Sequence, residues 1–167
     1  IKKNLSVIFL DTMGVFWTMK YPNLMDEELL EQWNLKPKGM DIRLYVPKGH
    51  FKEFKEKGFP VDHSFALRTS ELGANDWCDV LGVSVMDPIG ILIERTLEEL
   101  KKEFGQNYDL DDFEVFIEKN KRVQQSVKDA AINRLRNAQS WGLFSREGTT
   151  IDELIQRRKV TVIDLSA

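Results

Sequence analysis

Two aspartates follow apolar runs that lie near opposite ends of the sequence. Asp11 ends the run Ser6-Val7-Ile8-Phe9-Leu10, and Asp164 ends the run Val160-Thr161-Val162-Ile163. Continuous apolar runs of this length are typical of strands that are buried on both faces of a parallel sheet. If the two strands are parallel neighbours, both carboxylates lie at one edge of the sheet, where open α/β folds bind their ligands. Such a pair could position Mg²⁺ or its waters, or each Asp could simply cap the turn that follows it.

The residues around Asp11 offer one enzymatic interpretation. The segment Val7-Ile-Phe-Leu-Asp11-Thr12-Met13-Gly14-Val15 resembles the nucleophile motif of haloacid-dehalogenase-type phosphatases, in which an apolar strand leads to Asp-x-Asp-Gly. The resemblance implies that Asp11 attacks phosphorus as a carboxylate. The second Asp of the motif, which serves as the general acid, is Met13 here and cannot transfer a proton. A phosphatase therefore stays as a degenerate alternative.

Other catalytic and metal-binding patterns do not occur in the sequence. His50 and His63 are isolated and Cys78 is the only cysteine, so a Cys/His zinc cluster cannot form. There is no G-x-x-x-x-G-K-[ST] phosphate-binding loop and no nucleophile elbow. We therefore predict no catalytic residue and no metal site within this chain. The larger aromatic side chains are expected to lie in the core rather than to stack on bases: Trp17, Tyr21, Trp33, Trp77 and Trp141.

The composition indicates a folded chain that does not bind nucleic acid on its own. The 167 residues are 42% hydrophobic and carry a formal net charge of −3, whereas a free-standing nucleic-acid binder is usually basic. No apolar run approaches the roughly 18 residues needed to cross a bilayer, so we expect no membrane partner. A single cysteine fits a reducing compartment, and we predict a cytoplasmic location. The first residue is Ile rather than Met, which suggests an excised fragment.

Further elements are expected between the two apolar runs. Residues 42–46 and 64–68 favour strands, and residues 50–57 and 71–81 favour helices. Asn23 could cap another helix that carries one apolar face, formed by Met25, Leu29, Leu30 and Trp33.

The pattern becomes purely helical after Asp87. Helices are predicted at 88–104, 109–120 and 124–141, and Thr150 with Glu153 predicts a capping box before a fourth. No strand is expected between residues 88 and 157. This stretch is far longer than the dozen or so residues that a crossover between parallel strands needs. We therefore predict three segments: an α/β core region (1–87), an inserted helical bundle (88–157) and a returning core strand (158–167).

Three segments, taken together, resemble the HerA/FtsK-type P-loop ATPases, specifically the HerA-like archaeal and bacterial DNA-translocase branch. Residues 7–23, VIFLDTMGVFWTMKYPN, are similar to the family strand that ends in Asp-Pro-His-Gly-Glu. Residues 133–154, NRLRNAQSWGLFSREGTTIDEL, resemble the end of the inserted helical bundle of the family. Residues 159–166, KVTVIDLS, look like the strand with which the ATPase core resumes.

The resemblance implies a partial RecA-like parallel sheet that is interrupted by the bundle. It places Asp11, Gly14 and Asp164 near the nucleotide, with the Walker A loop before Ile1 and the Walker B strand after Ala167. The whole protein would then use ATP and Mg²⁺ to move DNA as a homo-oligomeric ring. The chain alone would bind no cofactor, and Val15 stands where the family carries its Glu, which puts the hydrolytic competence of the whole protein in doubt.

Three arginines of the helical segment could act on the nucleotide of a neighbouring subunit: Arg134, Arg136 and Arg146. Surface salt bridges are the alternative role for each. The sequence thus favours a non-catalytic fragment of a DNA-translocating ATPase. The alternatives are a non-catalytic oligomerisation or partner-binding module and the degenerate phosphatase.

Overall fold

A computed structural model describes residues 5–166 and divides the chain into two compact units. The sheet unit comprises Ile1–Phe65 and Thr150–Ala167, and the bundle unit comprises Ala66–Thr149. The structural division therefore lies at 65/66 and 149/150, where the sequence suggests 87/88 and 157/158. The helix at residues 74–81 packs with the bundle, which moves the first boundary toward the amino terminus. The outermost ends of the predicted segments, residues 1–4 and 167, lie outside the described residues.

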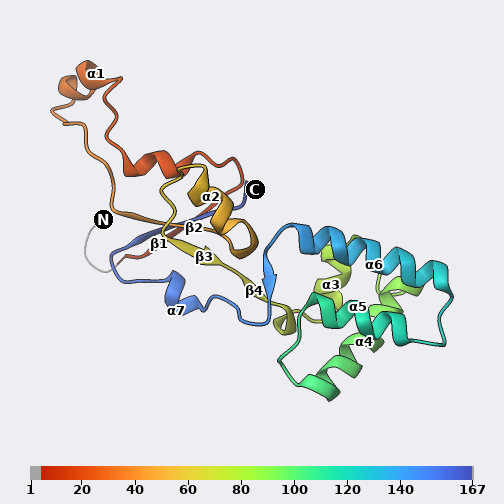
Figure 1. The fold of residues 1–167 in the computed structure, drawn as a ribbon. Coiled ribbons are helices and arrows are strands. Elements are labelled where there is room, and N and C mark those ends of the chain that lie inside the picture. Colours follow the sequence, from red (N-terminus) through yellow and green to blue (C-terminus); the bar gives the residue numbers. More distant parts are fainter. Residues whose placement is uncertain (1–4, 167) are drawn as a thin grey trace. The chain divides into compact units, whose positions relative to one another are not determined.

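The sheet unit is a mixed α/β structure built on four parallel strands (Figure 1). Its elements in chain order are β1 (Val7–Asp11), η1 (Phe16–Lys20), α1 (Glu27–Gln32), β2 (Ile42–Pro47), η2 (Lys48–His50), α2 (Phe51–Glu56), β3 (His63–Phe65), α7 (Ile151–Leu154) and β6 (Val160–Asp164). The strand order is β1-β6-β2-β3, and every neighbouring pair is parallel.

The first and last apolar runs of the sequence are neighbours in this sheet. β1 pairs with β6 in parallel, with Val7 opposite Val160 and Asp11 opposite Asp164. This pairing confirms the prediction that the two runs share one sheet and that their carboxylates reach the same edge. The whole bundle unit lies between these strands in the sequence, so it is an excursion from the sheet.

Helical elements cover both faces of the central strands. On one face, a buried cluster that includes Leu44 and Val162 packs against Trp17 of η1 and Phe54 of α2. On the other face, the Thr161 hydroxyl donates a hydrogen bond of 2.8 Å to the Leu154 carbonyl of α7. Coverage of both faces explains why β6 is apolar throughout, as expected for a central parallel strand.

Strand β1 differs from the prediction of a strand buried on both faces. It lies at the edge of the described sheet, and Ile8, Phe9 and Leu10 are exposed, Leu10 by 66%. An edge position removes one neighbouring strand and the side chains that would come with it, which accounts for the exposure.

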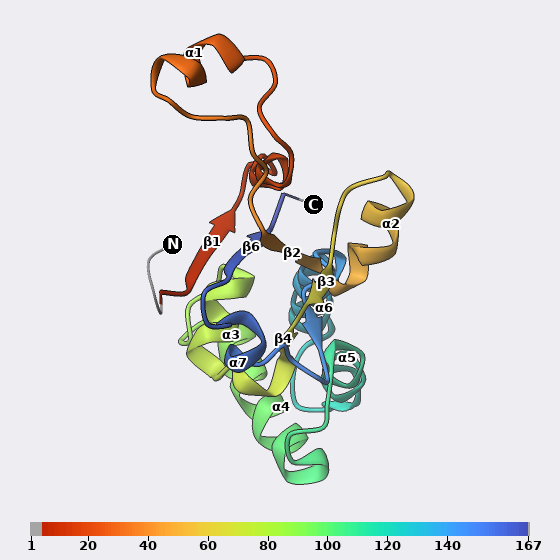
Figure 2. The same ribbon diagram turned by 90° about the vertical axis from the view of Figure 1, so that its left-hand side faces the viewer.

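The segment from residue 21 to residue 40, which we call the arm, also differs from its prediction. Helix α1 starts at Glu27, and Asp26 rather than Asn23 precedes it. Figures 1 and 2 show α1 at the tip of a loop that leaves the sheet and returns to it. The predicted apolar face formed by Met25, Leu29 and Trp33 packs on nothing in the described chain, and all three side chains are exposed. The expectation of a core position was therefore wrong for Trp33, and also for the exposed Tyr21 and Trp141.

The bundle unit contains four helices and one very short sheet. Its elements are β4 (Leu67–Arg68), η3 (Thr69–Glu71), α3 (Ala74–Leu81), α4 (Pro88–Phe104), α5 (Leu110–Lys119), α6 (Gln125–Ser140) and β5 (Phe144–Ser145). One buried cluster joins all four helices, with Trp77, Leu97, Phe113 and Leu135 among its members. The predicted apolar stripes of α4, α5 and α6 are confirmed, except that Phe104 is partly exposed.

Two predictions about strands in this region were wrong. The expected strand at 64–68 divides at Ala66 into β3 and β4, which belong to different sheets. The division occurs because the Ala66 backbone turns to Thr149: its N–H donates to the Thr149 hydroxyl (3.0 Å) and its carbonyl accepts from the Thr149 N–H (2.7 Å). Strand β5, which pairs with β4, lies within 88–157, where no strand was expected. None of the helices in residues 5–166 combines the length and the apolarity needed to cross a membrane.

Candidate functional site

Asp11 organises the turn that follows β1. Its side chain is 1% exposed, and its two oxygens accept hydrogen bonds from four consecutive backbone N–H groups. Oδ1 accepts from Met13 (3.1 Å) and Gly14 (2.9 Å), and Oδ2 accepts from Val15 (2.8 Å) and Phe16 (2.7 Å). The buried charge is therefore compensated entirely by backbone dipoles, which is the capping role that the sequence left open for Asp11.

Gly14 brings this turn against the end of β6. Its φ of 64° lies in the left-handed region, which glycine adopts without steric strain. A Cβ at this position would lie 2.3 Å from the Ser166 Oγ and 3.6 Å from the Asp164 Oδ1. Asp164 is also buried, and its Oδ1 accepts hydrogen bonds from the backbone N–H (2.9 Å) and the hydroxyl (2.7 Å) of Ser166. The structure thus brings Asp11, Gly14 and Asp164 together at the carboxyl edge of two adjacent parallel strands.

A cavity of about 370 Å³ opens at this edge. Its lining comes from the segments that follow three of the parallel strands: Gly14 after β1, Ser166 after β6, and His50, Glu53, Phe54, Lys57 and Phe59 after β2. Ligands of open parallel sheets bind at the carboxyl ends of strands, so this cavity occupies the expected place for a site. Its volume lies within the usual range for small-molecule pockets.

Glu53 connects the charged groups of the cavity. Its carboxylate lies 2.6 Å from the Lys57 Nζ and 3.5 Å from the His50 Nδ1. The hydrogen bond and charge of Lys57, with a smaller contribution from His50, hold the pKa of Glu53 below its usual value. Sequence reasoning treated His50 as isolated and missed this group. The spacing of three and four residues from Glu53 along one helical turn was the signal that could have found it.

The edge formed by this chain does not by itself fit a magnesium ion. Both oxygens of Asp11 are occupied by backbone N–H donors, and one oxygen of Asp164 is occupied by Ser166. Within residues 5–166, no group of three or more His, Cys, Asp or Glu side chains is arranged to hold a metal ion. Any ion at this edge would need ligands from segments outside the described chain.

The same hydrogen bonds weigh against the phosphatase alternative. A nucleophilic carboxylate needs an oxygen that can reach phosphorus, whereas each oxygen of Asp11 accepts two backbone N–H groups. Met13, which stands in the general-acid position, is exposed and has no proton to transfer.

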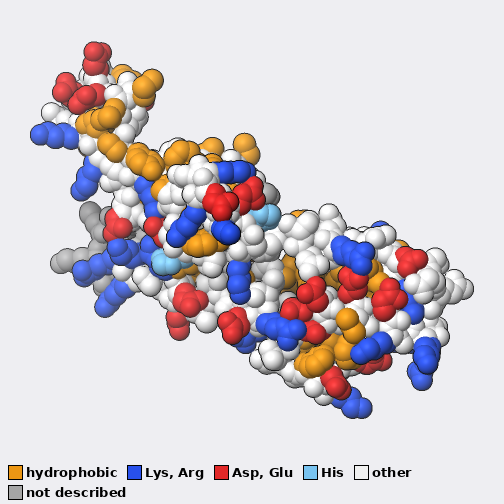
Figure 3. Space-filling view, in the orientation of Figure 1, with side chains coloured by type: hydrophobic (Ala, Val, Ile, Leu, Met, Phe, Trp, Pro, Cys, Tyr) orange, Lys and Arg blue, Asp and Glu red, His pale blue; other side chains and the backbone are white. Residues whose placement is uncertain are grey.

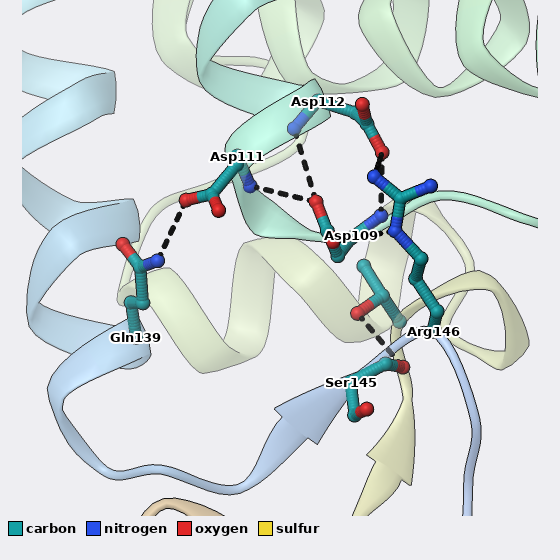
Figure 4. A network of polar contacts seen from close by, with 7 residues as sticks. Asp109, Asp111, Asp112, Gln139, Ser145 and Arg146 are labelled. Carbon is teal, nitrogen blue, oxygen red and sulfur yellow. Dashed lines mark hydrogen bonds and ion pairs between the residues drawn. The ribbon is translucent and has the colours of Figure 1, made fainter.

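Two of the three candidate arginines form ion pairs within the bundle unit. Arg136 pairs with Glu114, and Arg146 lies 2.6 Å from Asp109 and 2.9 Å from Asp112 (Figure 4). These carboxylates raise the pKa of both guanidinium groups above the usual value. Arg134 is exposed. Arg136 and Arg146 therefore have the structural role that the sequence left open.

The Arg146 network fastens the end of the bundle unit to the start of α5. Figure 4 shows Arg146 directed at Asp109 and Asp112, while Asp111 receives the Gln139 amide of α6 at 2.7 Å. Asp109 also caps α5 by accepting from the backbone N–H groups of Asp111 and Asp112. One cluster of acids thus caps a helix and holds the segment next to β5. The sequence analysis noted only that acids occur at this helix start.

Comparison of the chain with models of known protein families gives no match, and comparison with curated proteins gives none at a significant level.

Proposed function

We propose that this chain is an internal part of a P-loop ATPase of the HerA/FtsK type. In this proposal the sheet unit belongs to a RecA-like nucleotide-binding sheet, and the bundle unit is the helical insertion. One observation carries the proposal: β1 and β6 are adjacent, parallel and in register, and the complete bundle lies between them in the sequence. This is the arrangement that the resemblance of residues 7–23 and 159–166 requires.

The carboxyl edge supports a place beside the nucleotide rather than a catalytic role. Phosphoryl transfer by P-loop enzymes depends on a phosphate-binding loop, a lysine, Mg²⁺ and an arginine that stabilises charge. The turn at Asp11 and Gly14 is rigidly held and contributes shape to this edge, and Val15 supplies no carboxylate. ATP and Mg²⁺ would be held by segments outside this chain, and the chain alone is inactive.

The exposed apolar surface of β1 gives further support. A parallel strand is usually buried on both faces, yet Ile8 and Leu10 on one face and Phe9 on the other are exposed here. A sheet that continues beyond β1 in the whole protein would cover these side chains. By the same resemblance, the whole protein would assemble as a ring and move DNA.

Nucleotide assays on two proteins test the proposal. The 167-residue chain is expected neither to bind a fluorescent ATP analogue nor to hydrolyse ATP. A longer form of the same protein, extended at both ends, is expected to do both, with hydrolysis stimulated by DNA. ATP hydrolysis by the shorter chain that disappears in Asp11→Asn, with the fold checked by circular dichroism, would contradict the proposal. So would a longer form that binds no nucleotide.

A second candidate function is a non-catalytic assembly or partner-binding module. The exposed apolar side chains of the arm favour it, because contiguous apolar surface on a folded protein usually marks a contact site. The longer form discriminates between the two functions, since a module without a nucleotide role would associate equally well with and without ATP.

A further inference from the structure

We propose that the arm of one copy of this chain docks into a hollow at the amino edge of the sheet of a second copy. The inference stands on the arm and on the hollow, and it does not depend on the proposed ATPase function.

The arm presents an apolar surface that nothing in the described chain covers. Met25 is 94% exposed and Trp33 is 78% exposed. The exposed large apolar side chains of the arm are Tyr21, Leu24, Met25, Leu29, Trp33, Leu35 and Met40. Figure 3 shows these hydrophobic side chains gathered over the arm. Isolated exposed apolar residues are common, but seven within one twenty-residue segment make a patch of the kind that binds a partner.

The arm is a closed loop with a fixed base. The Met40 N–H donates to the Met19 carbonyl at 2.7 Å, and a Cβ on Gly39 would lie 2.2 Å from the Lys20 carbonyl oxygen. Its helix α1 has only six residues, which is too short to be stable in water without tertiary contacts. A partner that covers α1 would supply those contacts.

The charges on the arm exclude a contact between two arms. Asp26, Glu27, Glu28 and Glu31 lie on and beside α1, and Figure 3 shows carboxylates gathered at its tip. Among residues 5–166, none of the recorded ion pairs involves Glu27, Glu28 or Glu31. Two such arms facing each other would repel, because like charges placed close together oppose association. The partner surface must therefore be basic and lie elsewhere.

The sheet unit has such a surface at the amino end of β6. A hollow of about 540 Å³ is lined by Lys38, Gly39, Met40, Asp41, Arg158 and Val160. Asp41 is neutralised by Lys159, which lowers the pKa of Asp41. Lys38 and Arg158 have no carboxylate partner among the ion pairs of the described chain. The hollow thus offers two positive charges beside the apolar side chains of Met40 and Val160, which complements the acidic and apolar arm.

A contact between two different surfaces joins copies head to tail. Such a heterologous contact leaves one arm and one hollow free at the ends, so it produces dimers and short open oligomers. Because the attraction is partly between exposed charges, added salt weakens it. Closure into a ring belongs to the proposed function of the longer protein and is not required here.

Sedimentation velocity of the 167-residue chain over a range of concentrations tests the inference. The unmodified chain is expected to associate increasingly with concentration. An arm variant, Met25→Ser with Trp33→Ser, and a hollow variant, Lys38→Glu with Arg158→Asp, are each expected to weaken the association by about tenfold or more. The arm side chains are exposed, and Asp is tolerated at the positive φ of Arg158, so circular dichroism should remain unchanged.

The mixture of the two variants is the decisive sample. The arm variant keeps an intact hollow and the hollow variant keeps an intact arm, so an equimolar mixture should form a 1:1 dimer and nothing larger. Lys36→Glu with Arg157→Asp makes the same change of charge outside the hollow and should associate like the unmodified chain. Met86→Ser, which replaces an exposed methionine of the bundle unit, should do the same.

Three results would overturn the inference: an unmodified chain that is monomeric at every concentration, association that persists in both variants, or a mixture that forms no dimer. No nucleotide is present in these samples, so their outcome is independent of the nucleotide assays above. Failure of one proposal leaves the other standing.

Discussion

Replacement of Asp11 by asparagine tests whether this side chain is the structural centre of the carboxyl edge. The carboxylate accepts four backbone N–H groups, two on each oxygen. Asparagine has the same shape but offers one oxygen and one NH₂ group. Whichever way the amide turns, its NH₂ faces two backbone donors at the end of a buried side chain.

The expected loss follows from the two hydrogen bonds that the asparagine side chain cannot accept. A hydrogen bond to a charged group contributes roughly 1.5–3 kcal/mol. Asp11→Asn should therefore destabilise the sheet unit by about 3 kcal/mol or more, a large part of the roughly 5–15 kcal/mol that holds a domain folded. Asp164→Asn should cost less, since Ser166 is bonded through only one of its oxygens and an asparagine oxygen can replace it.

Hydrogen exchange measured by mass spectrometry in increasing urea reports the two units separately. Peptides that cover residues 5–16 and 159–166 should lose protection in Asp11→Asn, while peptides of α4 and α6 keep it. The exposed Asp26→Asn, whose side chain does not cap α1, serves as the control and should leave both units unchanged. A stability change for Asp11→Asn within about 0.5 kcal/mol of zero would refute the reasoning.

Three further predictions concern the bundle unit. Gly90→Ala should destabilise it by roughly 2 kcal/mol despite the better helix propensity of Ala, because the new Cβ would lie 2.2 Å from the Ser84 carbonyl oxygen; a raised melting temperature in a thermal scan would contradict this. Burial raises the pKa of Asp109, but the hydrogen bond and charge of Arg146 and the backbone N–H of Asp112 outweigh it, and the pKa lies below its usual value. The stabilisation from a lowered carboxyl pKa is present above the usual value of about 4 and is lost as the pH falls through the folded value. Acid unfolding followed by circular dichroism should therefore begin at a higher pH in Arg146→Gln, and identical curves would exclude this role. Burial, with a smaller contribution from Asp79, raises the pKa of the Cys78 thiol. A disulfide reagent should therefore label Cys78 only when the bundle opens, and labelling that is as fast as in urea would contradict this.

Local sequence signals predicted the elements whose partners lie close by. The Thr150 and Glu153 capping box exists as expected around α7, and α4 begins at Pro88 and ends at Phe104 as the sequence indicates. The parallel pairing of β1 with β6 was also predicted, because a long helical stretch between two apolar runs leaves few other arrangements.

Features that depend on what lies beside an element could not be predicted. The apolar residues of β1 and of the arm were expected in the core, since an apolar pattern indicates that a surface is covered but not by which chain. The division of the predicted strand at Ala66 depends on Thr149, a residue 83 positions away. Arg146 was assigned a possible role at a neighbouring nucleotide because its partners Asp109 and Asp112 lie far from it in the sequence.

The pairing of β1 with β6 can be tested most directly by NMR on the isotopically labelled 167-residue chain. Backbone contacts between residues 7–11 and 160–164 should run in ascending order, from Val7 beside Val160 to Asp11 beside Asp164. Contacts in descending order, or no contacts between these two segments, would contradict the shared parallel sheet and with it the placement of Asp11 and Asp164 at one edge.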